Sequence, residues 1–294
     1  MKEDVVVLAS DSLHGRQTGT SYEVMAADYI ANRFKNLGLE PKGTNGYFQE
    51  FSFKDKSDPH GNVDYVSKSE DSTITGTNVV GYLNNNAENT VVIGAHYDHL
   101  GMGIEGSLYR GDNPEIHNGA DDNASGTSAI IELAKLLKKK SPKNNNYLIL
   151  HFSGEELGLF GSKYWLEHPT YKGNLNYMIN LDMVGRYDTA RKLTVGGYGT
   201  STKWADILAK TPTSLITHYD SAGAGPSDHA SFYRKDMPVL FMFTGSHSDY
   251  HKATDDWDKI NYTGEAAIIQ YVNNIIKNTD AAGKLDFLKT RENS

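Results

Sequence analysis

The chain has 294 residues, of which 38% are hydrophobic and 22% charged. These values are typical of a globular protein with one large or two small domains, and they exclude a disordered, collagen-like or coiled-coil chain. A net charge of -8 disfavours nucleic acid as a partner, because the chain has no basic excess to replace the counterions of phosphates.

The sequence contains no cysteine, so a metal site would have to use His, Asp and Glu side chains. No apolar run reaches the roughly 18 residues that a membrane-spanning helix needs.

The first predicted element is an amphipathic helix over Ser21–Gly38. Its apolar positions recur every three or four residues, at Ala27, Ile30, Phe34 and Leu37. Gly38 is a suitable C-terminal cap, and Pro41, just beyond it, is a second signal that the helix ends. The alternating and polar sequence after this helix predicts hairpins or a small edge lobe around residues 48–77, too short for a separate domain.

Five short, nearly continuous apolar runs then predict strands that are buried on both faces of a sheet. They are Val91–Ala95, Tyr147–Phe152, Tyr177–Leu181, Leu193–Gly197 and Pro238–Phe243. Helical patterns lie between or after them, at Ile130–Leu137, Gly158–His168, Thr202–Lys210 and Ile268–Ile275. The alternation predicts an α/β fold with helices on both faces of the sheet, in which sites form at the carboxyl ends of strands.

Side chains of the types that bind metals follow four of these strands: His96 and Asp98, Glu155 and Glu156, Asp182, and His247 and His251. A further acidic pair, Asp121 and Asp122, precedes the Ile130 helix. Singly, such residues are usually solvated or structural. Together, so many carboxylates at one buried sheet edge would repel each other unless a cation neutralises them. The pattern therefore predicts a metal site, and the spacing alone does not separate His247 from His251 as a ligand.

Two short motifs indicate what such a metal site would do. His96 and Asp98 point the same way in an extended segment, so the carboxylate can accept the second ring N–H of a metal-binding imidazole. Glu155 and Glu156 follow each other in a turn, so one is expected to bind metal while the other faces a bound water as a base. A basic carboxylate beside an activated water indicates hydrolysis.

Six motifs, in the same order, resemble those of the co-catalytic di-zinc aminopeptidases of the bacterial leucyl aminopeptidase and aminopeptidase Y type. They are GAHYDH at Gly94, NGADDNASG at Asn118, SGEELGLFGS at Ser153, NLDMVG at Asn180, PSDHASF at Pro226 and DYHKATDDWDKIN at Asp249. The resemblance implies a three-layer α/β/α sandwich on a mixed, mostly parallel sheet of roughly eight strands. It also implies two zinc ions at the carboxyl edge of that sheet.

The resemblance further implies a ligand set. Asp121 would bridge the two ions, and the peptide bond that follows it would be cis. His96 and Asp182 would complete one site. Glu156 and His251 would complete the other, since the YHxxxD context favours His251.

Roles beyond metal binding follow from the same resemblance. Glu155 would be the general base, acting on a water between the ions, and Asp98 would orient His96. Tyr250 would polarise the scissile carbonyl, because the alternative position for this tyrosine in relatives holds Ala224 here. Three other histidines are expected to have structural roles beside the ligands: His99, His117 and His229.

The predicted function is that of a zinc-dependent exopeptidase, an aminopeptidase that removes N-terminal, apolar residues from peptides. The alternatives are a glutaminyl cyclase, a carboxypeptidase or dipeptidase of the same fold, and a binding module that has lost its metals. The number of zinc ions per chain would distinguish a glutaminyl cyclase from the exopeptidase, because the cyclase reaction uses a single zinc ion.

We expect residues 1–294 to form a single catalytic domain. The stretch from Glu40 to Val91 is too short for the protease-associated domain that many larger relatives insert there. The resemblance also implies a periplasmic or extracellular protein from which a signal or lipoprotein leader has been removed. The sequence does not predict an oligomeric state.

Overall fold

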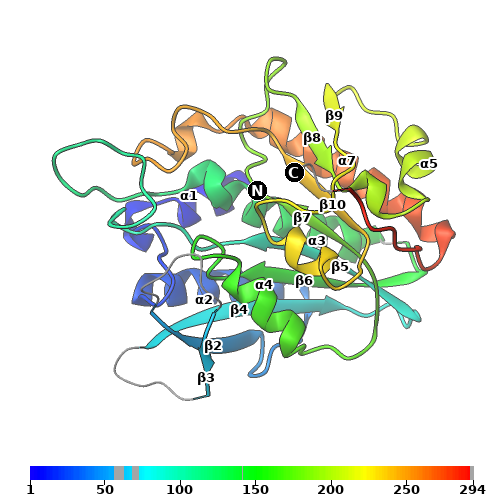
Figure 1. Cartoon of the computed structure of the whole chain (residues 1–294), viewed down its shortest axis with the longest axis horizontal. Helices are drawn as coiled ribbons and strands as arrows, with labels where there is room; N and C mark the ends of the chain where they lie inside the picture. Colours follow the sequence, from blue (N-terminus) through cyan, green and yellow to red (C-terminus); the bar gives the residue numbers. More distant parts are fainter. Residues whose placement is uncertain (56–62, 68–72, 141, 292–294) are drawn as a thin grey trace.

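The computed structural model describes residues 1–55, 63–67, 73–140 and 142–291 (Figure 1). Within these residues one mixed sheet has ten strands, in the order β3-β2-β4-β6-β5-β7-β10-β8-β9, and β1 pairs with β4. The strands are β1 (Glu40–Pro41), β2 (Phe48–Lys54), β3 (Tyr65–Val66), β4 (Thr73–Leu83), β5 (Asn89–His96), β6 (Asn145–Phe152), β7 (Asn174–Leu181), β8 (Leu193–Gly196), β9 (Thr217–Tyr219) and β10 (Val239–Phe243).

The four central strands, β6, β5, β7 and β10, run parallel to one another. Antiparallel neighbours flank them, with β4 beside β6 and β8 beside β10. All four parallel strands therefore present their carboxyl ends at one edge of the sheet, where the loops that follow them can meet.

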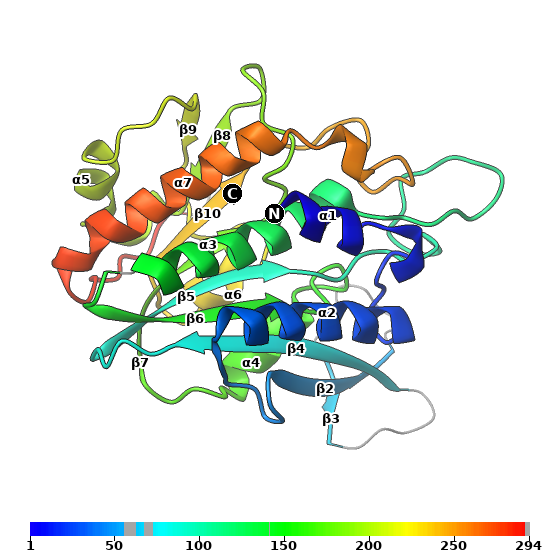
Figure 2. The ribbon, with the colours of Figure 1, turned by 180° about the vertical axis from the view of Figure 1, so that it is seen from behind.

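Helices cover both faces of this sheet. They are α1 (Lys2–Leu8), α2 (Ser21–Leu37), α3 (Gly126–Lys140), α4 (Phe160–Glu167), α5 (Trp204–Ala209), α6 (His229–Tyr233) and α7 (Tyr262–Thr279). Helices α4 and α6 lie on the face seen in Figure 1, and α1, α2, α3 and α7 lie on the face seen in Figure 2. The predicted three-layer α/β/α sandwich is confirmed.

Short helical turns complete the described structure: Asp11–Leu13, Ala120–Ser125, Tyr198–Thr200, Trp257–Lys259 and Asp280–Ala282. The Ala120–Ser125 turn is irregular, since Asp122 and Asn123 have non-helical backbone angles.

The alternation of side chains along the strands builds a core on each side of the sheet. In β5, Val91 and Ile93 pack in the larger core under α2, α3 and α7, whereas Val92 packs with Leu148 in the core under α4 and α6. Strands that are buried on both faces need an apolar side chain at nearly every position. This requirement explains the continuous apolar runs in the sequence.

The predicted helices and the five predicted strands are all present, and α2 begins at the predicted Ser21 and ends directly before the predicted cap Gly38. Thr20 accepts the backbone N–H of Glu23, and Gly38 adopts the left-handed conformation at the C-terminus. The strand count of ten exceeds the predicted eight because the stretch around 48–77 contributes β2, β3 and the start of β4 to the edge of the same sheet. Residues 56–62 and 68–72 of that stretch lie outside the described part.

Across the described residues, none of the helices is both long and apolar enough to cross a membrane.

Candidate metal centre and active site

The side chains predicted to bind metal meet at the carboxyl edge of the parallel strands. His96 is the last residue of β5, and Glu155 and Glu156 follow β6. Asp182 follows β7, and His251 lies in the long loop after β10. These positions explain how residues far apart in the sequence converge, because neighbouring parallel strands end side by side.

His96 lies among three carboxylates. Its Nε2 atom is 3.3 Å from Asp122 Oδ1, 3.4 Å from Asp182 Oδ1 and 3.7 Å from Glu155 Oε2. The imidazole and these carboxylates are nearly inaccessible to solvent. Three acidic groups around one buried nitrogen are the ligand types expected around a divalent cation.

His251 forms the other half of the cluster. Its Nε2 atom is 3.1 Å from Asp122 Oδ2 and 3.1 Å from Glu156 Oε2. The two oxygens of Asp122 thus face two different histidines. Nε2 of His96 and Nε2 of His251 are both buried and have no hydrogen-bond partner among the described residues. A buried imidazole nitrogen that faces carboxylates and makes no hydrogen bond has a lone pair available to a metal ion.

The prediction that Asp121 bridges the cluster is wrong in this geometry. Asp121 Oδ2 lies 2.8 Å from Nε2 of His247, and its Oδ1 accepts the backbone N–H of Gly185 at 2.8 Å. The cis peptide bond follows Asp122, between Asp122 and Asn123, and not Asp121. Consecutive residues of this turn point in different directions, so the carboxylate one position further along reaches the histidines.

The same arrangement decides between the two candidate histidines of the β10 loop. His251 faces Asp122 and Glu156, whereas His247 is occupied by Asp121. The structure therefore brings His251, and not His247, into the cluster.

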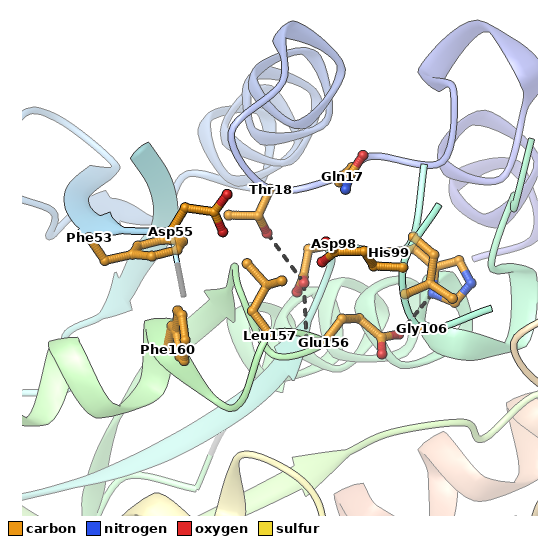
Figure 3. Close-up of a pocket in the computed structure, with 12 residues that line it drawn as sticks. Gln17, Thr18, Phe53, Asp55, Asp98, His99, Gly106, Glu156, Leu157 and Phe160 are labelled. Atoms are coloured by element: carbon orange, nitrogen blue, oxygen red, sulfur yellow. Dashed lines mark hydrogen bonds and ion pairs between the residues drawn. The ribbon is translucent and has the colours of Figure 1, made fainter. Parts of the chain in front are cut away.

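Asp98 supports the cluster in two ways. Its Oδ1 is 3.4 Å from Nδ1 of His96, and the Asp98 backbone oxygen lies at 3.1 Å from the same nitrogen. In addition, its carboxylate accepts the backbone N–H of Glu155 at 3.2 Å. It also accepts the backbone N–H of Glu156 at 3.3 Å (Figure 3). One buried carboxylate thus contacts the imidazole of His96 and also fixes the turn that carries both glutamates.

Three further residues support the cluster, and the sequence analysis assigned none of them a role. Thr18 donates to Asp98 at 3.3 Å. Asp255 accepts the backbone N–H groups of Asp121 and Asp122, at 3.0 and 3.1 Å. Arg16 is fully buried and donates to four backbone carbonyls, those of Leu8, Tyr97, Asn118 and Gly119.

Arg16 links the chain's N-terminal part to the loops after β5 and before α3. Burial lowers the pKa of its guanidinium to about 10, against the raising effect of Asp98 and Asp122. The guanidinium therefore remains charged at neutral pH, and it offsets part of the negative charge of Asp98 and Asp122.

Burial also controls the protonation of the acidic cluster. It raises the pKa of Glu155 well above its ordinary value; His96 opposes the rise, while Glu156 and Asp182 add to it. Burial acts on Asp122 in the same sense, but the imidazoles of His251 and His96 outweigh it, so that the pKa of Asp122 lies well below its usual range. Two carboxylates in one cluster thus have opposite tendencies to hold a proton.

Tyr250 stacks on the ring of His251, with 4.0 Å between ring centroids and 21° between the planes. Its side chain is partly exposed. Burial and the nearby carboxylates, led by Asp122, raise the pKa of its phenol, so the hydroxyl is a proton donor at neutral pH.

The three histidines predicted to have structural roles differ in how close they lie to the cluster. His99 Nδ1 lies 2.9 Å from Glu156 Oε1, a more direct contact with the cluster than the sequence predicts. His117 hydrogen-bonds Ser107 and the backbone oxygen of Glu115, and His229 stacks on Phe241.

The donor set fits zinc. Imidazole nitrogens and carboxylate oxygens are zinc ligands, and three combinations of the cluster bring ligand atoms within 4.8 Å of one another. They are His96–Asp122–Asp182, His96–Glu155–Glu156 and His99–Asp122–Glu156. A cluster of this kind at the carboxyl edge of parallel strands is suited to metal-dependent hydrolysis.

Comparison with known proteins specifies the family. The sequence profile described as peptidase family M28 matches residues 78–276. A probable leucine aminopeptidase of Arthroderma benhamiae is 32% identical over 163 residues, which cover 53% of this chain and 43% of that protein. The match thus spans less than half the length of that relative.

Two solved structures share the fold over nearly their whole length. A Zn-dependent exopeptidase from Parabacteroides distasonis has a TM-score of 0.72 at 18% identity, covering 94% of this chain and 97% of the other. A Bacteroides thetaiotaomicron glutaminyl cyclase also has a TM-score of 0.72 at 18% identity, covering 95% and 98%. The chain belongs to peptidase family M28, because the profile of that family matches more than half of its residues.

Proposed function

We propose that the protein is a zinc-dependent aminopeptidase that binds two zinc ions and releases N-terminal residues from peptides. The observation that carries the proposal is the position of Asp122, whose two carboxylate oxygens face the unpartnered Nε2 atoms of His96 and His251. A carboxylate shared in this way is suited to hold two cations close together.

The two halves of the cluster suggest which residues hold each ion. His96 and Asp182 would complete one position, and His251 and Glu156 would complete the other, with Asp122 common to both. When bound, the zinc ions would polarise the scissile carbonyl and lower the pKa of a water molecule.

The chain's own residues would move the protons. Glu155 is the carboxylate left over once the ligands are assigned, and its raised pKa suits a group that takes a proton from water and passes it to the departing amine. The phenol of Tyr250, beside His251, would donate a hydrogen bond to the carbonyl oxygen as negative charge develops there.

An apolar preference for the first residue of the peptide is part of the proposal. Its support is Met183, a nearly buried side chain directly after Asp182 in the sequence.

Peptides with blocked ends test the direction of cleavage. The zinc-loaded enzyme is expected to release leucine from Leu-Ala-Ala-NH2 and to leave N-acetyl-Leu-Ala-Ala-NH2 intact. Cleavage of a peptide blocked only at its N-terminus, with release of the C-terminal residue, would identify a carboxypeptidase and overturn the proposal.

A glutaminyl cyclase is the second candidate, because a cyclase is among the solved structures with this fold. Mass spectrometry on a peptide that begins with glutamine separates the two reactions. Hydrolysis releases free glutamine, whereas cyclisation releases ammonia and leaves the peptide chain at full length.

Export to the periplasm or the extracellular space is also a proposal, supported by the resemblance to exported aminopeptidases. Fractionation of the producing cells, with assay of the medium, would test it. The proposed partners are peptide substrates.

A further inference from the structure

A cavity of about 540 Å³ opens beside the cluster, on the side of Glu156 (Figure 3). Its walls come from the segment before α2, the end of β2, and the loops after β5 and β6. The lining residues are Gln17, Thr18, Phe53, Asp55, Asp98, His99, Leu100, Glu105, Gly106, Glu156, Leu157 and Phe160. Neither Asp182 nor His96 is among them, so the cavity adjoins only one half of the cluster.

The cavity combines apolar and acidic walls. Phe53 and Phe160 form an edge-to-face pair, with 4.8 Å between ring centroids, and Leu157 lies close to them. Asp55 and Glu105 are exposed acids at the surface of the cavity. No lysine or arginine is found among the described residues that line it. The cavity is therefore suited to a side chain with an apolar stem and a positively charged tip.

The position of the cavity indicates which part of a peptide it would receive. The stacking of Tyr250 on His251 places the proposed carbonyl donor at the His251 and Glu156 half, which leaves the other half for the free amine. The carbonyl carbon is bonded to the nitrogen of the second residue. The peptide chain beyond that bond can then continue on the side of Glu156, where the cavity opens.

Glu105 is connected to the same half through its neighbour. The backbone oxygen of Gly106 lies 2.9 Å from Nδ1 of His251, and the N–H of Leu108 donates to the His251 backbone oxygen at 2.8 Å. The loop that carries Glu105 is thus hydrogen-bonded to His251, and the scissile bond would lie beside His251.

We propose that this cavity binds the side chain of the second residue of the substrate and selects peptides with lysine or arginine at that position. The proposal rests on the aminopeptidase function proposed above. It makes peptides with a cationic second residue the preferred substrate class.

Four substrates that differ only in the second residue test this selection: Leu-Lys-NH2, Leu-norleucine-NH2, Leu-Gly-NH2 and Leu-Glu-NH2. Lysine and norleucine have the same four-carbon stem, so their ratio of kcat/KM reports the charged tip alone. We expect this ratio to be about threefold to tenfold, the scale of one or two exposed ion pairs, and to fall as salt is added. Norleucine should exceed glycine by about tenfold or more, because its stem is buried, and glutamate should be the poorest substrate.

The double variant Asp55→Asn/Glu105→Gln should bring the lysine-to-norleucine ratio close to one, with the norleucine-to-glycine ratio unchanged. The matched control is Glu88→Gln/Glu167→Gln, which removes two exposed acids outside the cavity. Glu88 precedes β5 and so lies at the opposite end of that strand from His96. The control should retain the ratio of the unaltered enzyme.

A lysine-to-norleucine ratio at or below one in the unaltered enzyme would overturn the inference, as would a ratio that the Asp55→Asn/Glu105→Gln variant leaves unchanged. Either result with continued release of leucine leaves the aminopeptidase proposal standing. Failure of the zinc-loaded enzyme to release leucine from all four substrates would refute the aminopeptidase proposal, and the inference with it.

Discussion

Two pairs of identical neighbouring residues have different surroundings at this site. Asp121 faces His247, whereas Asp122 faces His96 and His251. Glu155 lies near His96, and Glu156 contacts His99 and His251. Because the members of each pair are chemically the same, substitution of each separately isolates the effect of position.

The aspartate pair tests the corrected bridging assignment. Asp122→Asn should lower bound zinc to well below one ion per chain, because it removes a ligand from both halves of the cluster. Asp121→Asn should retain both ions, since its carboxylate is directed at His247 and the Gly185 backbone. Zinc per chain, measured by atomic absorption after dialysis, decides between them. Loss of zinc in Asp121→Asn with retention in Asp122→Asn would restore the prediction made from the sequence.

The glutamate pair separates the base from the ligand. Glu155→Gln keeps the size of the side chain but cannot accept the proton, so kcat should fall by about a hundredfold to ten-thousandfold with zinc retained and KM little changed. Glu156→Gln should instead lose zinc, because an amide is a poor substitute for an anionic ligand. Undiminished turnover in Glu155→Gln would remove the proposed proton transfer.

Tyr250 has a structural interpretation as well as a chemical one, since it packs on His251. Tyr250→Phe keeps the ring and removes only the hydroxyl. We expect kcat to fall by about tenfold to a thousandfold, and the upper end of this range is the effect of removing one oxyanion donor. The zinc content should not change. Steady-state kinetics at saturating zinc provide the measurement, and an unchanged kcat would leave Tyr250 with packing alone.

The sequence could predict which residue types gather at the site, but not how the backbone orients them. The predicted strand ends were enough to place four residues at one edge of the sheet, because parallel strands end side by side. These residues are His96, Glu155, Glu156 and Asp182. The distinction between Asp121 and Asp122 depends on backbone angles in an irregular turn, and no spacing rule encodes those. Arg16 was missed for a related reason, since its partners are backbone carbonyls and carry no side-chain signature.

At the scale of elements, the start of α2 is tied to the turn after β6. Glu23, in the first turn of α2, is fully buried, and it accepts from the Ser153 hydroxyl at 2.5 Å and from the Gly19 N–H at 3.2 Å. Ser153 directly follows β6 and precedes the glutamate pair. This contact connects the helix layer to the part of the loop that carries Glu155 and Glu156.

Glu23 makes this junction sensitive to pH. Burial raises the pKa of its carboxyl to about 8, although the hydrogen bond from Ser153 lowers it. An unfolded chain has this pKa near 4.3, so the folded state binds more protons between these values. Stability from this group is therefore fully present below about pH 4.3 and is lost as the pH rises through about 8.

Glu23→Gln should remove this dependence, because an amide needs no proton to stay neutral. Thermal melts of both proteins, with zinc at saturation, should give similar Tm values near pH 5. By pH 8.5 the variant should have the higher Tm, by on the order of 5 °C. A difference in Tm that stays constant between these pH values would show that Glu23 does not titrate in this range.

The length of an element governed how well the sequence predicted it. α2 and α7 have 17 and 18 residues, enough for several turns of apolar periodicity and, in α2, for recognisable caps. β1, β3 and β9 have two or three residues each, and α6 has five. Segments of that size contain no full period, so tertiary contacts and not local pattern determine them.

At the scale of the whole molecule, two apolar cores hold a sheet whose carboxyl edge carries an excess of buried acid. Asp98, Asp122, Glu155, Glu156 and Asp182 all lie there, in a chain that is already negative overall. Repulsion among these carboxylates opposes folding, because the folded state brings them together away from water. The loops that carry them come from strands across the centre of the sheet, so relief of the repulsion should stabilise the entire fold.

Zinc should therefore stabilise the protein against unfolding as well as activate it. An ion present at about 100 times its Kd contributes about 2.7 kcal/mol, so two ions should raise the Tm of the chelator-treated protein by about 5–15 °C. Calorimetric titration should give a stoichiometry near two. Glu155→Gln should show the full increase in Tm, since it keeps the ligands, whereas Asp122→Asn should show little. A Tm that zinc leaves unchanged in the chelator-treated protein, with no heat of binding, would contradict the metal site. An increase in Tm with one ion bound per chain would keep the site but reject the pair of ions, and would favour the cyclase reaction over hydrolysis.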